Sequence, residues 1–139
     1  ITMSFQWNSG KNKAGYKGMI YSSSGGVGLG THGSISKHEM NNVFGAFGPS
    51  LKKGLVCCTP TGNVDLTPTI MHLLGLKTDT PFDGRPIFEA LSNGINPEQV
   101  KVNTEEFTSE YADNGEVFQQ KLVMSSVGNT RYIDYAERS

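Results

Sequence analysis

Residues 30–54 read GTHGSISKHEMNNVFGAFGPSLKKG, and residues 57–76 read CCTPTGNVDLTPTIMHLLGL. The second stretch predicts a helix over residues 63–75. Pro68 is tolerated in the first turn, because the amides of that turn have no acceptor within the helix, and Gly75 is a typical C-terminal stop. The helix is the best-defined element of the sequence, and the other elements are interpreted outward from it.

The predicted helix is amphipathic. Asn63 or Asp65 can cap its N-terminus, and apolar side chains recur along one face at helical spacing. We expect this stripe to pack into a hydrophobic core, whereas His72 falls on a different face and is expected to be structural or surface-exposed. The stripe consists of Leu66, Ile70, Leu73 and Leu74.

Other segments predict strands and loops. Residues 1–7 alternate between apolar and polar side chains, which predicts a half-buried strand, and residues 8–18 predict a loop. Residues 40–47 contain several apolar side chains and stop at Gly-Pro, which predicts a short buried strand. Residues 86–91 predict a short helix opened by its proline.

The C-terminal third predicts a β-hairpin. Residues 120–127 and 130–135 read as strands, and Gly128-Asn129 is a two-residue turn between them. Strands and helices therefore mix, with a hairpin at the end, and the predicted class is α/β or α+β. At 139 residues the chain is expected to be a single domain, 1–139.

Composition excludes some classes of function. The formal net charge is −1 and 36% of residues are apolar, so no basic patch for nucleic acid is expected. No apolar run is long enough to span a membrane. Cys57 and Cys58 are adjacent and form no CxxC motif, so we expect two buried or half-buried thiols rather than a redox or zinc motif.

Candidate reactive residues are few. His32 and His38 lie six residues apart, and with Glu39 they could supply two or three zinc ligands, although adjacent His38 and Glu39 do not naturally converge. A lone structural or surface histidine is the alternative for His32. Residues 22–30 can be a flexible linker or a phosphate-cradling loop. The paired carboxylates are expected to be solvated surface groups: Glu105 with Glu106, and Asp79 with Asp83.

Residues 30–91 carry an ordered series of motifs. They are a Gly-x-His-Gly loop, Ala-x-Gly-Pro, a turn ending in Lys-x-Gly, Asn-Val-Asp-Leu-x-Pro-Thr with a following Leu-Leu-Gly, and Asp-Gly-Arg. In this order they resemble the C-terminal part of the alkaline phosphatase-like superfamily, with type I phosphodiesterase/nucleotide pyrophosphatase as the closest branch. The resemblance implies the C-terminal portion of an alkaline phosphatase-like fold, a fragment of a larger catalytic domain.

The resemblance also implies a chemistry. Enzymes of this family hold two zinc ions that clamp a phosphoryl group, and the histidine of the late Gly-x-His-Gly loop is a ligand of one zinc. By that match His32 is the metal ligand of this chain. The nucleophile and the other ligands should lie upstream of Ile1, in the remainder of the parent catalytic domain, which would be the partner of this chain.

Three functions stay open. The first is a segment of a zinc-dependent hydrolase of phosphodiester or phosphomonoester bonds, with a small phosphate-ester substrate, in which the isolated chain is inactive. The second is a non-catalytic C-terminal structural or interaction module. The third is a segment of a sulfatase, because sulfatases share the superfamily core. The residues do not decide the compartment, although the resemblance implies one outside the cytoplasm.

Overall fold

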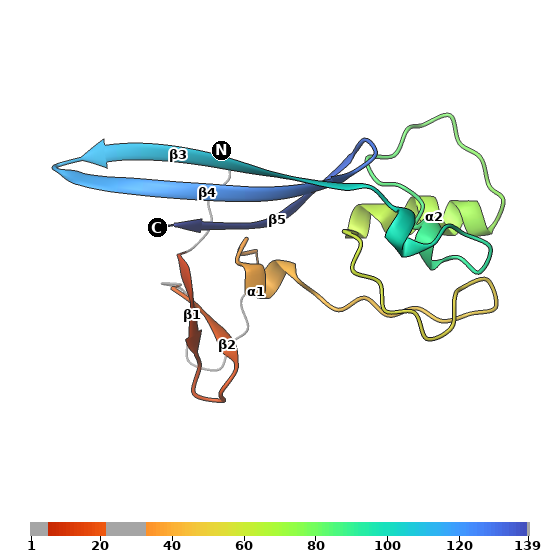
Figure 1. Ribbon diagram of the computed structural model, residues 1–139, viewed down its shortest axis with the longest axis horizontal. Helices are drawn as coiled ribbons and strands as arrows, with labels where there is room; N and C mark the ends of the chain where they lie inside the picture. The colour runs from red at the N-terminus through yellow and green to blue at the C-terminus, as the bar shows by residue number, and fades with distance from the viewer. Residues whose placement is uncertain (1–5, 22–32, 139) are drawn as a thin grey trace. The chain divides into compact units, whose positions relative to one another are not determined.

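The computed structural model describes residues 6–21 and 33–138. They form a mixed α/β structure with two sheets and few helices (Figure 1). The chain divides into two compact units, which are described separately. Unit 1 comprises Ile1–Val43, Glu105–Met124 and Ile133–Ser139, and unit 2 comprises Phe44–Thr104 and Ser125–Tyr132. The single-domain interpretation stays a prediction.

Unit 1 begins with an antiparallel hairpin of β1 (Trp7–Lys11) and β2 (Lys17–Ile20). The loop predicted over residues 8–18 is therefore wrong. Most side chains of β1 are exposed, so the strand shows no apolar alternation and is held by backbone pairing. The turn is closed by the Asn12 side chain, which accepts hydrogen bonds from two backbone amides. Of the strand expected over residues 1–7, only the last two residues are described.

A short helix, α1 (Lys37–Met40), follows in unit 1 and contacts the hairpin. Its N-cap is Ser36, whose hydroxyl accepts a hydrogen bond from the His38 amide at 3.1 Å. Gly18 has φ of +104°, and a Cβ atom there would press against the His38 side chain at 2.9 Å. Glycine is therefore needed at this position both for backbone conformation and for close packing.

The three-stranded sheet has the order β3 (Val102–Asp113), β4 (Glu116–Val127) and β5 (Thr130–Arg138). Two-residue turns join consecutive strands (Figure 1). The predicted terminal hairpin is confirmed, and Gly128 has φ of +58° in its turn. The sequence analysis missed the first turn, Asn114-Gly115, in which both residues have positive φ, a strong hairpin signal.

Unit 2 contains the predicted helix, which is confirmed. It begins as the 3₁₀ turn η1 (Asn63–Asp65) and continues as α2 (Leu66–Leu73). Gly75 ends it with φ of +64°, and its amide donates to the His72 carbonyl at 3.1 Å. The helix predicted over residues 86–91 is only the 3₁₀ turn η2 (Phe88–Ala90), and a further 3₁₀ turn, η3 (Pro97–Gln99), leads to β3.

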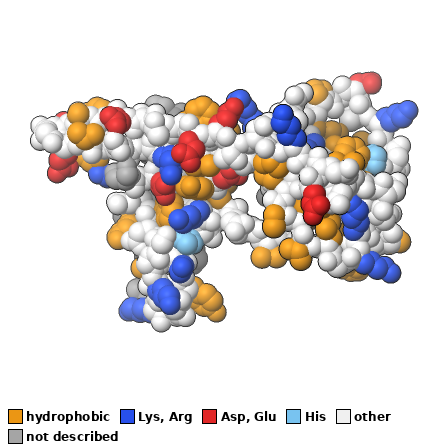
Figure 2. Space-filling view, viewed as in Figure 1, with side chains coloured by type: hydrophobic (Ala, Val, Ile, Leu, Met, Phe, Trp, Pro, Cys, Tyr) orange, Lys and Arg blue, Asp and Glu red, His pale blue; other side chains and the backbone are white. Residues whose placement is uncertain are grey.

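Two burial predictions are wrong. Residues 42–47 form no strand, and Val43 and Phe47 are each 99% exposed; the apolar side chains there find no neighbouring strand among the described residues. The apolar stripe of the helix is not core either, because Ile70 and Leu74 are 54% and 66% exposed. The face of the helix that packs within unit 2 is the opposite one. Apolar side chains accordingly lie at the surface of both units (Figure 2).

One of the two thiols is more exposed than predicted. Cys57 is half-buried as expected, and its Sγ lies 3.3 Å from Thr59 Oγ1, whereas Cys58 is exposed. Among the described residues, no helix combines the length and apolar character that crossing a membrane requires.

Lys52 ties two segments of unit 2 together. Its ammonium donates hydrogen bonds to the carbonyl oxygens of Glu89 at 3.1 Å, Gly94 at 3.3 Å and Ile95 at 2.5 Å. The Lys52 amide also donates to the Ala90 carbonyl at 2.9 Å. Because an ammonium has three N–H donors, these carbonyls satisfy it completely.

We predict that Lys52→Met lowers the free energy of unfolding by about 1–3 kcal/mol, since the three carbonyls lose their donor. Urea unfolding followed by circular dichroism measures the change. Lys53→Met is the matched control, because Lys53 is exposed and its loss should leave the midpoint almost unchanged. Equal midpoints for the two variants would show that the ammonium does not hold these segments.

Candidate functional site

His32, the predicted metal ligand, lies outside the described residues, as does the preceding part of its glycine-flanked loop. Its assignment as a ligand stays a prediction. Gly33 is the first described residue after it and has φ of +93°. A bend of this kind is one that glycine adopts without strain.

Of the alternative local zinc site, His38 and Glu39 are described, and each contacts other groups. The His38 imidazole lies edge-on to the Trp7 indole at 5.6 Å, with Nε2 at 3.2 Å from Ser9 Oγ. The Glu39 carboxylate instead accepts a hydrogen bond from the Ser34 amide at 3.1 Å. Within residues 6–21 and 33–138, no three His, Cys, Asp or Glu side chains come together in a way that could hold a metal ion.

His72 is an exposed residue of α2, and its imidazole contacts the Phe88 ring edge-on, with the ring centroids 5.0 Å apart. The prediction that it is not on the apolar stripe is confirmed. The carboxylates of both predicted pairs are exposed, as expected for solvated surface groups. None of the candidate residues proposed from spacing therefore forms a reactive group in the described part of the chain.

The buried polar side chains of unit 2 form a cluster that the sequence analysis missed, made of Asp65, Arg85, Glu89 and Tyr132. Asp65 and Glu89 are both 0% exposed. Asp65 occupies the N-cap position of α2 but makes no capping bond to that helix. Its carboxylate instead accepts from the Gly62 amide at 2.9 Å, the Arg85 amide at 2.8 Å and the Tyr132 hydroxyl at 3.0 Å.

Arg85 is the centre of the cluster, and every N–H of its guanidinium has an acceptor. Two parallel bonds join it to the Glu89 carboxylate, at 2.6 and 2.8 Å, the bidentate geometry that arginine favours with carboxylates. The remaining N–H groups donate to the Tyr132 hydroxyl and to the carbonyls of Pro60 and Pro86, at 3.2 to 3.3 Å. No N–H is left for an anionic ligand.

The charges of the cluster shift the acidities of its members. Burial of the Glu89 carboxylate acts to raise its pKa, but the hydrogen bonds from Arg85, a backbone hydrogen bond and the charges of Arg85 and Lys52 together lower the net pKa. The hydrogen bond to Glu89 raises the pKa of Arg85. Burial, together with the hydrogen bond to Asp65, raises the pKa of Tyr132 to about 12. At neutral pH the cluster therefore holds an ion pair beside a neutral phenol.

Gly84 allows the cluster to assemble. A Cβ atom at this position would overlap the carbonyl oxygen of Val64, so only glycine lets the backbone approach the start of the helix this closely. That approach brings the Arg85 amide within reach of Asp65. The glycine and arginine of the Asp-Gly-Arg motif are thus explained by packing and hydrogen bonding within unit 2.

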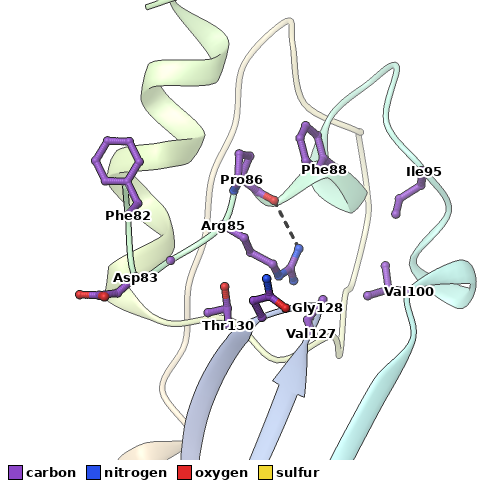
Figure 3. A pocket seen from close by; sticks show the side chains of 12 residues that line it. Phe82, Asp83, Arg85, Pro86, Phe88, Ile95, Val100, Val127, Gly128 and Thr130 are labelled. Atoms are coloured by element: carbon purple, nitrogen blue, oxygen red, sulfur yellow. Dashed lines mark hydrogen bonds between the residues drawn. The ribbon is translucent and has the colours of Figure 1, made fainter. Parts of the chain in front are cut away.

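A cavity of about 510 Å³ lies beside the cluster. Figure 3 shows the Arg85 side chain along it, with a hydrogen bond to the Pro86 carbonyl, and shows Asp83 pointing away from Arg85. The described walls are mainly apolar: Phe88, Ile95, Val100 and Val127. Because the guanidinium is fully bonded, the cavity fits an apolar group better than a phosphate or sulfate.

The cluster had a sequence signal, although an incomplete one. Arg85 and Glu89 are four residues apart, a spacing that favours an ion pair, and Asp65 interrupts an otherwise uncharged segment. Tyr132 contacts Asp65 across 67 positions of sequence. Nothing local in the sequence indicates that contact.

Comparison with known proteins finds one informative similarity. The chain is 35% identical over 75 residues to a protein named Sulfatase ppz1 from Metarhizium majus (strain ARSEF 297). The similarity covers 50% of this chain and 18% of the relative. No family model matches the chain, and no solved structure matches it. Half of the chain is thus similar to a small part of a sulfatase.

We predict that Glu89→Leu lowers the free energy of unfolding by about 3 kcal/mol, because it leaves the half-buried guanidinium of Arg85 without its counter-ion. The double variant Arg85→Met/Glu89→Leu should lose less than the sum of the two single variants. Denaturant unfolding of the four proteins gives the coupling energy. Glu137→Leu, at the more exposed pair with Lys121, should change little. Additive losses at residues 85 and 89 would contradict the pairing.

A second prediction concerns alkaline pH. The Tyr132 pKa of about 12 lies above its ordinary value of 10.0, so its stabilising effect is complete below pH 10 and is lost as pH rises through 12. The loss should amount to about 2–3 kcal/mol. Tyr132→Phe should lack this part of the decline in unfolding free energy, whereas Tyr111→Phe, at an exposed position, should retain it. Parallel curves for all three proteins would refute the assignment.

Proposed function

We propose that this chain is part of a hydrolase of the alkaline phosphatase superfamily that cleaves phosphate or sulfate esters. The observation that carries the proposal is the 35% identity between half of the chain and a sulfatase. The ordered motifs of residues 30–91 also resemble this superfamily. Because the similarity covers 18% of the relative, the proposed activity belongs to a larger protein of which this chain forms a part.

One observation favours a phosphate ester as substrate and another favours a sulfate ester. The motif order resembles type I phosphodiesterases, which favours a phosphodiester or phosphomonoester. The name of the relative favours a sulfate ester. Both substrates are tetrahedral oxyanions, so the same electrostatic principle stabilises their transition states. Hydrolysis assays with a sulfate ester and with a phosphate ester distinguish the two substrates.

His32 is the metal ligand that we propose for this chain. The described residues do not form a metal site, and Asp65 and Glu89, their most buried carboxylates, are fully engaged by Arg85 and its neighbours. In the proposed hydrolase His32 is one zinc ligand, and the nucleophile and the other ligands come from outside this chain. We derive no catalytic step from the described residues.

The role proposed for the described residues is to support the site rather than to react. Arg85 cannot bind a substrate oxyanion without breaking a bond to Glu89, Tyr132 or a carbonyl. Glu89 is held as a buried anion by that same arginine, so it is not free to move a proton. A non-catalytic module is the second candidate function, and this saturated cluster is the observation that favours it.

We predict that the isolated chain hydrolyses neither p-nitrophenyl sulfate nor bis-p-nitrophenyl phosphate, with or without added zinc. The longer parent hydrolase should cleave at least one of them and lose activity to a chelator. In that parent, His32→Ala should lower kcat/KM by a factor of about 10² or more, since a catalytic metal would lose a ligand.

His38→Ala in the same parent is the matched control, because His38 contacts Trp7 and Ser9 rather than a metal. It should keep nearly full activity. A His32→Ala parent with unchanged activity would remove His32 from the metal site. A parent that cleaves neither ester would favour the non-catalytic module.

A further inference from the structure

The apolar stripe of α2 is exposed, and the opposite face of the helix packs within unit 2. The face that packs within unit 2 carries the buried Pro68 and also Thr69, whose Oγ1 donates to the Asp65 carbonyl at 2.6 Å and accepts from the Ile87 amide at 3.0 Å. His72 packs on Phe88 from this same face. The apolar face points outward. The apolar stripe of an amphipathic helix ordinarily faces a hydrophobic core, so the exposed stripe of α2 lacks the surface on which such a stripe normally packs among the described residues.

The exposed stripe is strongly apolar and uncharged. Ile70, Leu73 and Leu74 are all exposed, as is Leu76 directly after the helix. The segment from residue 66 to residue 76 contains no Asp, Glu, Lys or Arg. Contiguous exposed apolar side chains mark an interaction surface, and the lack of charge fits an apolar protein surface rather than nucleic acid or anionic lipid.

A second copy of the chain is a poor match for this surface. The eight residues of α2 make a helix about 12 Å long. Pairing two such helices would bury far less than the roughly 800 Å² per partner of a stable protein interface. A larger body of protein is needed to cover the stripe together with its surroundings.

We propose that the stripe Ile70, Leu73, Leu74 and Leu76 docks onto the remainder of the hydrolase, the part of the protein that carries the nucleophile and the other metal ligands. This inference rests on the proposed function. The relative supplies the argument for the occupant, because the similarity covers only 18% of its length. The remaining sulfatase chain is the kind of body that would cover the stripe.

The test uses the full 139-residue chain and a defined probe. The probe is the Metarhizium majus sulfatase with its 75 matched residues deleted, co-expressed with the chain and purified through a tag on the probe. Wild-type chain should co-purify with it. Ile70→Ser/Leu74→Ser should co-purify about tenfold less or worse, the loss expected when two apolar side chains no longer become buried. Val56→Ser is the matched control, because Val56 is an apolar side chain 88% exposed outside the stripe.

Hydroxyl-radical footprinting provides the second readout. In the complex, oxidation of Ile70 and Leu74 should fall several-fold relative to the free chain, whereas oxidation of Val56 should not. Circular dichroism of the free variants shows whether each still folds; the substitutions lie at exposed positions, so their spectra should match the wild type.

Each other outcome overturns the inference. Equal co-purification of all three chains would show that the stripe is not the contact, and recovery of none would exclude the remainder of the hydrolase as its occupant. A dimer of the free chain that Ile70→Ser/Leu74→Ser dissolves would assign the stripe to a second copy. Ester hydrolysis by the complex reports on the proposed function separately, since docking without turnover would leave the interface standing and remove the activity.

Discussion

The buried ion pair of Arg85 and Glu89 is the interaction on which unit 2 depends. Taking both charges out of water is costly, and the cost is offset only because each hydrogen-bonding group of the pair is satisfied. Satisfying them requires segments distant in sequence: the carbonyls of Pro60 and Pro86 and the hydroxyl of Tyr132. The start of α2 joins through Asp65. The pair therefore constrains the helix, the following loop and the C-terminal hairpin at once.

The hydrogen bonds of this ion pair also indicate that the cluster is structural rather than reactive. An arginine and two carboxylates beside a cavity could be taken for a catalytic centre, but every N–H of the guanidinium already has an acceptor, and both carboxylates are buried and hydrogen-bonded within the cluster. Unit 2 thus presents a rigid polar centre on one side of α2 and an apolar stripe on the other. This arrangement is consistent with the supporting role proposed for the described residues. The similarity to part of a sulfatase agrees with that interpretation.

The sequence predicted those elements whose ends are set by residues with strong backbone preferences of their own. Gly75 ends the helix and Gly128-Asn129 turns the hairpin through their own backbone preferences. The failures have a common cause: the apolar residues near 43–47 and the stripe of α2 were expected to be buried, yet their burial depends on surfaces that a sequence pattern does not locate. The contact between Asp65 and Tyr132 spans 67 positions, so the cluster could not be assembled from spacing. His32 was chosen from motif resemblance, and its loop lies outside the described residues.

The claim that Arg85 is a structural residue rather than a receptor for the substrate oxyanion is open to direct observation. Nuclear magnetic resonance can follow the Arg85 Nε–H of the isotope-labelled chain during titration with sulfate and with phosphate. The account predicts a resonance that stays in place up to high anion concentration, because that N–H is already bonded to the Tyr132 hydroxyl. A saturable shift at Arg85, absent from exposed arginine signals, would show that the cluster binds anions and would contradict the account.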